Sequence, residues 1–347
     1  MPLLEVNNLG IDYITEKGTL EAVRGVSFSL ERGQNLGLVG ESGCGKTTVA
    51  KSLMKLLPSN GVISEGEIIF KGQDVVEMTP EKVRQIRWND ISMIAQSAMN
   101  AMDPVYKIKD QIIEVIKTHQ SQVDKKEAIE RAANLFELVG LERKRLNSYP
   151  HQLSGGMKQR AIIAMALALS PALVIADEPT TALDVVVQDR ILHQIIKLQQ
   201  EINTSMVFIT HDISVVAETC DQIIVMYGGR IAEIGSTRDF FKDTHHPYGL
   251  GLQNAFPSIN EIGERLISMP GSPPNLINPK PGCRFAPRCP FAEDVCYAEM
   301  PGLQEIKPGH YSACHFTDRI DEFREKAKLR ETWEQVKERQ IKKQLRR

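Results

Sequence analysis

The chain has 347 residues, of which 42% are hydrophobic and 25% are charged, close to an ordinary globular composition. This composition excludes a wholly disordered protein, and the length allows one large domain with an appendage or two domains. The formal net charge of −2 at pH 7 argues against a nucleic-acid binder, because no excess of cations is available for phosphates.

The first hundred residues show strand patterns around one predicted helix. The N-terminus lacks the basic and apolar regions of a secretory signal, so we expect a cytosolic chain. A glycine-rich turn separates a short apolar strand from a helical pattern that Pro58 stops. The predicted strands are 4–6, 26–30, 35–39, 66–70 and 91–95, and the predicted helix is 47–57.

The middle of the chain is helical at first and then alternates. Residues 105–146 have a charged helical pattern without a strand signal, which predicts an inserted helical subdomain. Helices are then predicted at 161–169 and 185–201, and strands at 172–176 and 205–210. The longest nearly apolar run, 161–169, is about half of the ~18–20 residues that a bilayer span needs. The alternation predicts a parallel sheet with helices on its faces.

The turn Gly40–Thr47 matches G-x-x-x-x-G-K-S/T, the pattern of phosphate-binding loops. Its glycines let the backbone curl so that successive N–H groups point at phosphate oxygens. Lys46 supplies a mobile cation to the β- and γ-phosphates, and the Thr47 hydroxyl is suited to ligate Mg²⁺. Because the pattern lies between a predicted strand and a predicted helix, it indicates nucleotide binding rather than an incidental glycine-rich turn.

Two acids, Asp177 and Glu178, follow the apolar strand 172–176, which places them at the carboxyl edge of the sheet beside the phosphate loop. Alone, such a pair would more commonly cap a helix, but beside that loop it indicates a catalytic and metal-binding role. Asp177 is suited to hold Mg²⁺, and Glu178 is suited to orient or deprotonate the attacking water.

A second cluster of donors, Ser154, Gly155 and Gly156, precedes the apolar helix 161–169. The Ser154 hydroxyl and the backbone of the two glycines form either a second anion site at a helix start or a simple N-cap with a Gly-Gly turn. In isolation the N-cap interpretation would be favoured.

These three motifs, in this order, resemble the ATP-binding subunits of ABC transporters over about residues 3–240. The resemblance implies an α/β P-loop NTPase fold with an inserted helical subdomain, and Mg²⁺-dependent hydrolysis of ATP to ADP and phosphate. Tyr13 would stack on adenine. The residues that the resemblance assigns to ATP binding are Tyr13, Gly40, Glu41, Ser42, Gly43, Cys44, Gly45, Lys46, Thr47 and Thr48.

The resemblance also assigns the catalytic residues. Gln96, after the predicted strand 91–95, would contact Mg²⁺ and the nucleophilic water, and His211 would contact the γ-phosphate. Catalysis is thus assigned to Glu178, His211 and Gln96, and Mg²⁺ binding to Thr47, Gln96 and Asp177.

The remaining implied sites face a partner ATPase. The loop 181–184, ending in Asp184, would cross to that partner. The signature residues Ser154, Gly155, Gly156 and Met157 would bind the partner's ATP, so that two domains pair head to tail around the nucleotide. The family signature usually ends in Gln, and Met157 cannot donate a hydrogen bond, so we expect altered detail rather than lost function. Since the chain has one copy of each motif, it needs a second ABC ATPase subunit, identical or similar.

The segment 246–250 and four later cysteines resemble the C-terminal extension of oligopeptide/dipeptide importer ATPases, a group that includes nickel-uptake relatives. This implies a peripheral subunit on the cytoplasmic face of the cell membrane that powers peptide import through two separate permease subunits. An extracytoplasmic solute-binding protein would act indirectly, and no nucleic acid is implied. We expect an ATPase domain at 1–243 with a helical subdomain at about 97–160, an extension at 244–320 and a charged helix at 321–347.

Three alternatives remain open at this point. The transported solute could differ, with nickel as one example. The chain could be a soluble ABC ATPase acting on ribosomes or DNA, although such proteins usually carry two ATPase units or a long coiled coil. It could also be a redox or sensing protein built around its cysteines, which the intact ATP motifs disfavour. The charged tail either packs Trp333 on the domain or contacts the membrane surface or permease loops.

The cysteines Cys283, Cys289, Cys296 and Cys314 are spaced C-x₅-C-x₆-C-x₁₇-C, unlike the C-x₂-C pattern of zinc fingers. In a reducing compartment they predict a metal site more readily than disulfides. Four thiolates suit a 4Fe–4S cluster or Zn²⁺ equally, and the resemblance favours the cluster. Arg284 and Arg288 would offset the cluster's negative charge, whereas His310 and His315 could replace ligands of a zinc ion.

Overall fold

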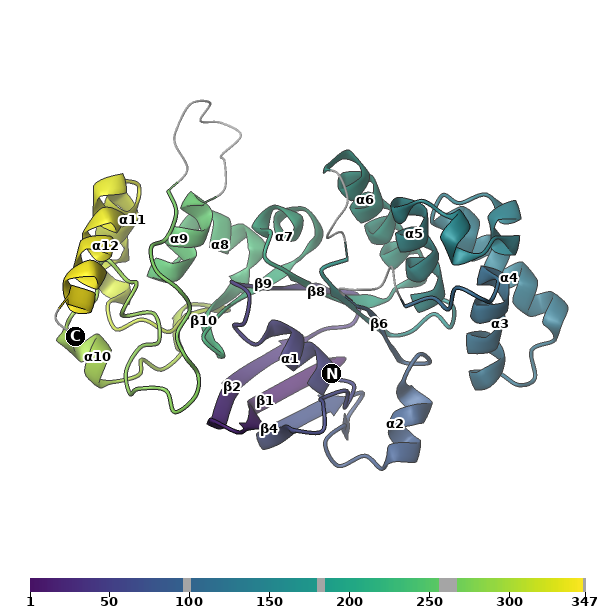
Figure 1. The fold of residues 1–347 in the computed structure, drawn as a ribbon, viewed down its shortest axis with the longest axis horizontal. Coiled ribbons are helices and arrows are strands. Elements are labelled where there is room, and N and C mark those ends of the chain that lie inside the picture. The colour runs from purple at the N-terminus through teal and green to yellow at the C-terminus, as the bar shows by residue number, and fades with distance from the viewer. Residues whose placement is uncertain (96–100, 180–184, 256–266, 346–347) are drawn as a thin grey trace.

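Two β-sheets organise the part of the chain that the computed structural model describes, residues 1–95, 101–179, 185–255 and 267–345 (Figure 1). The larger sheet has eight strands in the order β11-β12-β10-β9-β3-β8-β7-β6. Its strands are β3 (Asn35–Val39), β6 (Ile91–Ile94), β7 (Leu173–Asp177), β8 (Ser205–Thr210), β9 (Gln222–Tyr227), β10 (Arg230–Ser236), β11 (Gln304–Lys307) and β12 (His310–Ser312).

The centre of the larger sheet confirms the predicted parallel sheet, and antiparallel strands extend it at one edge. Strands β9, β3, β8, β7 and β6 run parallel, and β3, β7 and β8 are buried along their whole length. Strands β10, β12 and β11 are antiparallel. The direction reverses because Gly228 and Gly229, with φ of 54° and 82°, form a two-residue hairpin turn that requires positive φ.

The smaller sheet is antiparallel, with the order β2-β1-β4-β5. It packs beside helix α1 and below the larger sheet (Figure 1). One apolar cluster, including Val6, Leu36 and Val49, joins the two sheets to α1 and fixes the position of the loop between β3 and that helix. The elements are β1 (Leu4–Thr15), β2 (Gly18–Leu30), β4 (Gly61–Phe70), β5 (Gln73–Asp74), α1 (Lys46–Ser52) and α2 (Pro80–Ile86).

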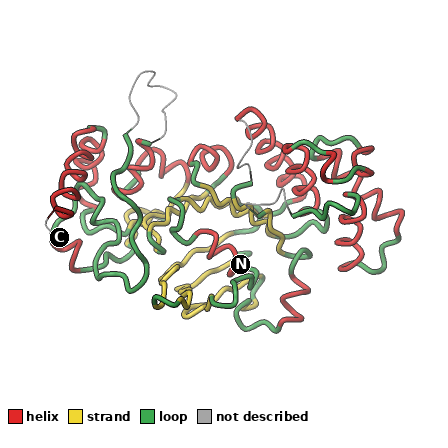
Figure 2. The backbone as a smooth tube through the Cα atoms, viewed as in Figure 1, coloured by secondary structure: helices red, strands yellow, loops and turns green. Residues whose placement is uncertain are grey.

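The remaining helices cover the larger sheet and its two ends (Figures 1 and 2). Helices α3 and α4 confirm the helical pattern of 105–146, and α10 to α12 lie at the opposite end of the molecule. These elements are α3 (Ile108–His119), α4 (Lys125–Leu138), α5 (Gly155–Ala166), α6 (Val185–Ile202), α7 (Ile213–Thr219), α8 (Thr237–Asp243), α9 (Pro247–Asn254), α10 (Asp294–Ala298), α11 (Ile320–Ala327) and α12 (Arg330–Leu345), with short 3₁₀ turns at Arg143–Asn147, Pro150–Gln152 and Thr317–Arg319.

Two predicted helices have other limits in the structure, and the predicted single tail helix is divided. Helix α1 ends at Ser52 instead of residue 57, and Lys55 then takes a left-handed φ of 49°. Helix α5 begins six residues before the predicted start at 161, because Ser154 caps it and the first turn accepts two glycines. The tail forms two helices, and the Trp333 Nε1–H donates to the Ala327 carbonyl 2.8 Å away across the break.

Candidate functional site

The loop between β3 and α1 has backbone geometry that only glycine allows. Gly40 and Gly45 have φ of 147° and 103°, and a Cβ atom there would lie 2.2 Å from the Met226 carbonyl and 2.6 Å from the Ala22 carbonyl. At Gly43, with φ of 79°, a Cβ would meet no atom within 4 Å. The loop is therefore tight against the protein at its ends and open in the middle, where a ligand has room to approach.

Lys46 folds back over this loop. Its Nζ donates to the Gly40 carbonyl at 2.6 Å and to the Glu41 carbonyl at 3.0 Å, and the residue is 6% exposed. A buried ammonium needs such acceptors, and phosphate oxygens are stronger ones. The lysine is thus held at the mouth of the loop by bonds that an incoming anion can replace.

The structure brings Thr47 and Asp177 together although they lie 130 positions apart in the sequence. The Thr47 hydroxyl donates to Asp177 Oδ1 at 3.2 Å. Asp177 ends β7 and is 2% exposed, and burial raises the pKa of its carboxyl above the usual value. A hydroxyl and a carboxylate at this distance are oxygen ligands of the kind that Mg²⁺ prefers.

Glu178 and His211 also meet, at the carboxyl ends of β7 and β8. The His211 Nδ1 lies 3.1 Å from Glu178 Oε1, and the Glu178 N–H donates to the Ile209 carbonyl at 2.8 Å. The Glu178 side chain is 16% exposed and that of His211 is 64% exposed. This pair stands beside the buried Asp177, so the structure gathers these three predicted catalytic and metal-binding residues at one edge of the sheet.

Tyr13 comes to the same site from the smaller sheet. Its hydroxyl lies 3.2 Å from the Thr48 hydroxyl on α1, and its ring lies over Gly61 of β4, where a Cβ would come within 2.8 Å. An aromatic ring is therefore present on one side of the loop, where the sequence analysis expects the adenine base.

The signature residues lie apart from this loop. Ser154 caps α5 by accepting the Met157 N–H at 3.3 Å, and Ser154 and Gly155 are exposed. The Met157 side chain packs against the apolar cluster of the helical region, a role that needs no hydrogen bond. Gln96 and Asp184, with the rest of 181–184, lie outside the described residues.

The four late cysteines line one small apolar pocket, with no disulfide between them. Burial raises the pKa of three thiols, those of Cys283, Cys289 and Cys314, the last to about 12. Within the described ranges, however, no three His, Cys, Asp or Glu side chains are close enough to hold a metal ion. Thiols are donors of the kind that Zn²⁺ and iron–sulfur clusters take, but the predicted metal-binding extension is not shown by this arrangement.

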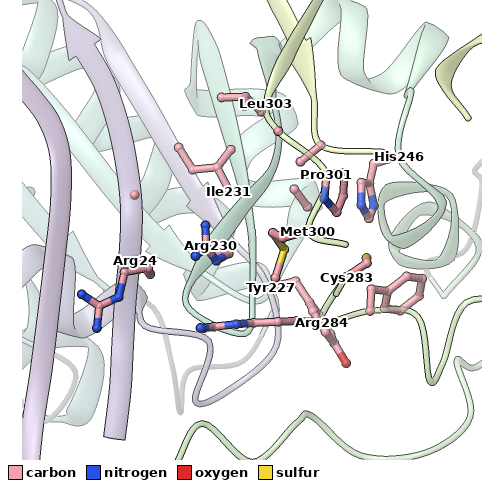
Figure 3. Close-up of a pocket in the computed structure, with 15 residues that line it drawn as sticks. Arg24, Tyr227, Arg230, Ile231, His246, Cys283, Arg284, Met300, Pro301 and Leu303 are labelled. Carbon is pink, nitrogen blue, oxygen red and sulfur yellow. The ribbon is translucent and has the colours of Figure 1, made fainter. Parts of the chain in front are cut away.

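The charged neighbours of the cysteines were assigned wrongly. Arg284 extends away from Cys283 (Figure 3) and pairs with Glu21 of β2 at 2.7 Å. Arg288 pairs with Glu41 of the phosphate loop. Their charges are therefore neutralised by acids of the ATPase region and do not offset a cluster.

The histidines considered as zinc ligands also have other partners. His310 is fully buried and its Nε2 lies 2.7 Å from Glu233 Oε1, outside the cysteine pocket. His315 lines the pocket, but its Nε2 lies 3.0 Å from the Glu299 carbonyl.

Comparisons with known proteins agree with this geometry. The ABC transporter family model matches residues 23–181, and the model of the oligopeptide/dipeptide transporter C-terminal region matches 232–296. The dipeptide transport ATP-binding protein DppD of Lactococcus lactis is 45% identical over 318 residues, which cover 91% of this chain and 91% of that protein. This chain belongs to the ABC ATPases of the oligopeptide/dipeptide transporter family.

Other members and a solved structure extend the match. The oligopeptide transport ATP-binding protein OppD of Escherichia coli is 44% identical over 90% of this chain and 92% of its own length. The dimeric post-hydrolysis structure of the ATP-binding cassette MJ0796, bound to ADP and Pi, has a TM-score of 0.61 at 26% identity, covering 68% of this chain and 99% of that one. The predicted α/β P-loop fold of an ABC ATPase is thereby confirmed. Among the described helices of this family member, none is both long and apolar enough to traverse a lipid bilayer.

Two residues of the extension, Tyr248 and Arg288, touch the phosphate loop, a contact that the sequence did not predict. The only available signal was their residue type, because Arg and Tyr are common anchors of buried polar contacts. Nothing in the local pattern indicated their partner.

Proposed function

We propose that this chain is the ATP-hydrolysing subunit that powers import of di- or oligopeptides through separate membrane permease subunits. The observation that carries this proposal is the set of relatives at 43–47% identity, whose names describe peptide, dipeptide or oligopeptide transport. The match of residues 232–296 to the C-terminal region of such transporters supports the same branch.

In the proposed reaction, Lys46 and the N–H groups of the loop 40–48 bind the β- and γ-phosphates of ATP. Thr47 and Asp177, with Gln96, would hold Mg²⁺, which neutralises phosphate charge when bound. Glu178 orients the attacking water and accepts its proton, and His211 contacts the γ-phosphate. The 3.1 Å contact between Glu178 and His211 supports a joint role, because it places an acceptor and a donor at one point.

We propose that hydrolysis takes place in a dimer with a second ABC ATPase subunit. Ser154, Gly155, Gly156 and Met157 would complete the nucleotide site of the partner, and the loop ending in Asp184 would cross to it. The exposure of Ser154 and Gly155, away from this chain's own loop, supports that arrangement. The dimeric form of the similar cassette MJ0796 supports it as well.

Membrane partners complete the proposal. The chain would sit peripherally on the cytoplasmic face of the membrane, bound to two permease subunits, with a solute-binding protein acting on the other side. Residues 1–243 would carry ATP hydrolysis, with the helical subdomain at about 97–160 contacting the permeases. The extension 244–320 would carry the cysteine pocket, and 321–347 the charged tail.

Reconstituted uptake tests the proposed function. The chain is combined in liposomes with its permease subunits and solute-binding protein, and uptake of labelled di- and oligopeptides is measured with and without ATP. We expect ATP-dependent peptide uptake that Lys46→Ala abolishes. Uptake of nickel without any peptide uptake would contradict the peptide assignment.

We further propose that Cys283, Cys289, Cys296 and Cys314 bind a 4Fe–4S cluster with a structural role. Their common apolar pocket supports this, and Zn²⁺ is the alternative for the same thiols. Protein purified without oxygen should be brown and contain about four irons per chain. The Cys296→Ser variant should lose iron and melt at a lower temperature. Cys220 lies outside the pocket, so Cys220→Ser should keep its iron and the wild-type melting temperature. Colourless protein that contains zinc would contradict the cluster.

A further inference from the structure

Glu41, the second residue of the phosphate loop, has every polar group engaged. Its N–H donates to the Tyr248 hydroxyl at 2.8 Å, and its carboxylate accepts from Arg288 Nη1 at 2.5 Å and Nη2 at 2.8 Å. Its carbonyl accepts from Lys46 Nζ at 3.0 Å. One residue thus connects two side chains of the C-terminal extension to the cation of the loop.

Arg288 is itself fixed in one orientation. It is 3% exposed, its Nε donates to the Pro270 carbonyl at 2.8 Å, and its Nη1 also donates to the Tyr227 hydroxyl at 3.2 Å. A planar guanidinium that makes two parallel bonds to a carboxylate in a buried setting is among the strongest polar contacts in proteins. The side chain is therefore built as a rigid support.

The backbone that carries Arg288 is equally well held. The Arg288 N–H donates to the Phe285 carbonyl at 2.8 Å in a tight turn. The Phe285 ring packs at an angle on Tyr227 and Tyr248, with ring centres 5.1 and 5.3 Å apart. The three aromatic rings join the turn to β9 and α9, so Tyr248 and Arg288 form one unit facing Glu41.

We propose that Arg288 and Tyr248 are positioning residues for the nucleotide site, which act through Glu41 to hold the phosphate loop and Lys46 in the conformation that receives ATP. This inference rests on the proposed binding of ATP at that loop. It gives the C-terminal extension an indirect part in nucleotide binding, through Glu41.

The physical reason is preorganisation. A glycine-rich loop has many accessible backbone conformations, and ATP must select the one in which the N–H groups converge. Anchoring Glu41 by its carboxylate and its N–H restricts those conformations before ATP arrives. Asp177 ends another strand, β7, and Glu178 follows it, so a different part of the sheet positions these two acids. Loss of the anchor should therefore weaken ATP binding and leave turnover at saturating ATP nearly unchanged.

The test compares ATP affinity by calorimetry, and KM with kcat by phosphate release, in the full chain. Arg288→Gln should raise Kd and KM about tenfold, equivalent to about 1.4 kcal/mol, with kcat within about twofold. Tyr248→Phe, which removes one hydroxyl and keeps the ring, should also raise Kd and KM. Arg288→Lys should fall between wild type and Arg288→Gln, because lysine keeps the charge without the fork.

Arg284→Gln is the matched control. Arg284 is also a buried arginine of the extension, but it pairs with Glu21 of β2 and does not contact Glu41. We expect this variant to bind ATP with wild-type affinity. In a double-mutant cycle, Glu41→Gln and Arg288→Gln should cost no more together than either alone.

Three results would overturn the inference. One is unchanged ATP affinity in both Arg288→Gln and Tyr248→Phe. Another is a loss of ATP affinity in Arg284→Gln equal to that in Arg288→Gln, because it would indicate only general docking of the extension. If Arg288→Gln does not fold, the result for Tyr248→Phe decides. Failure of the wild-type chain to bind ATP would instead remove the proposed nucleotide site, and the inference with it.

Discussion

Glu178 has a left-handed backbone conformation, with φ of 50°, immediately after β7. This region costs a residue with a Cβ about 1–2 kcal/mol, and such strain is concentrated at functional sites. The bond from its N–H to the Ile209 carbonyl holds the conformation and directs the carboxylate to His211. The backbone at this one position therefore supports the proposed role of the side chain.

Glu178→Gln tests that role. The amide keeps the shape of the side chain but cannot accept a proton, so ATP should bind while hydrolysis slows by roughly 10²–10⁴-fold. ATP-bound dimers should then accumulate in size-exclusion chromatography. Glu218→Gln, an exposed carboxylate on α7, serves as the control and should leave phosphate release unchanged. Undiminished hydrolysis in Glu178→Gln would remove Glu178 from the reaction.

At the level of elements, the sequence predicts contacts well where one rule of topology applies. Thr47 and Asp177 are 130 positions apart, yet their meeting is predictable, because carboxyl ends of parallel strands share one edge of the sheet. The glycine pattern of the phosphate loop and the apolar runs of the buried strands are also readable, because they are local in the sequence. The sequence therefore predicts β3, the phosphate loop and the acids at the end of β7.

Other contacts could not be predicted for a physical reason. Arg288 lies 247 positions from Glu41, and no local pattern distinguishes a charge that faces cysteines from one that faces another part of the protein. The antiparallel addition of β12 to β10 is similar, since a three-residue strand carries almost no pattern. Such pairings are decided by packing of the whole extension on the sheet edge.

Asp243, at the end of α8, joins three elements. It pairs with Lys307 of β11 at 2.9 Å and also bonds Arg324 of α11. Partial burial raises the pKa of its carboxyl. The hydrogen bonds from Lys307 and His245 and the charge of Arg324 outweigh this effect and lower the pKa to about 2. Because the folded pKa lies below the ordinary 3.8, this carboxylate stabilises the fold above about pH 4, and the contribution is lost as the pH falls toward 2.

Asp243→Asn should therefore lower the free energy of unfolding by roughly 1 kcal/mol at pH 7, a modest value because the site is partly exposed to solvent. The difference from wild type should shrink as the pH falls below 4. Urea denaturation at several pH values measures it. Asp321 is another partner of Arg324, and its side chain is 92% exposed. Asp321→Asn should therefore change the free energy of unfolding little. A difference that stays constant down to pH 3 would contradict this assignment.

At the level of the whole molecule, the phosphate loop and the signature residues lie in different regions. Helix α1 lies between the two sheets, whereas α5 belongs to the helical region at one end (Figure 1). If each nucleotide is held by the loop of one chain and by Ser154 of another, a chain with a defective loop and a chain with a defective signature can together form one intact site.

A mixing experiment measures this. Lys46→Ala and Ser154→Arg should each be inactive alone, because every site in either homodimer lacks one half. In a mixed dimer, one site combines the intact loop of the Ser154→Arg chain with the intact signature of the Lys46→Ala chain. With random pairing, roughly a quarter of the wild-type ATPase activity should return on mixing. If wild-type chains alone hydrolyse ATP but the mixture recovers nothing, each chain completes its own site and the head-to-tail dimer is excluded.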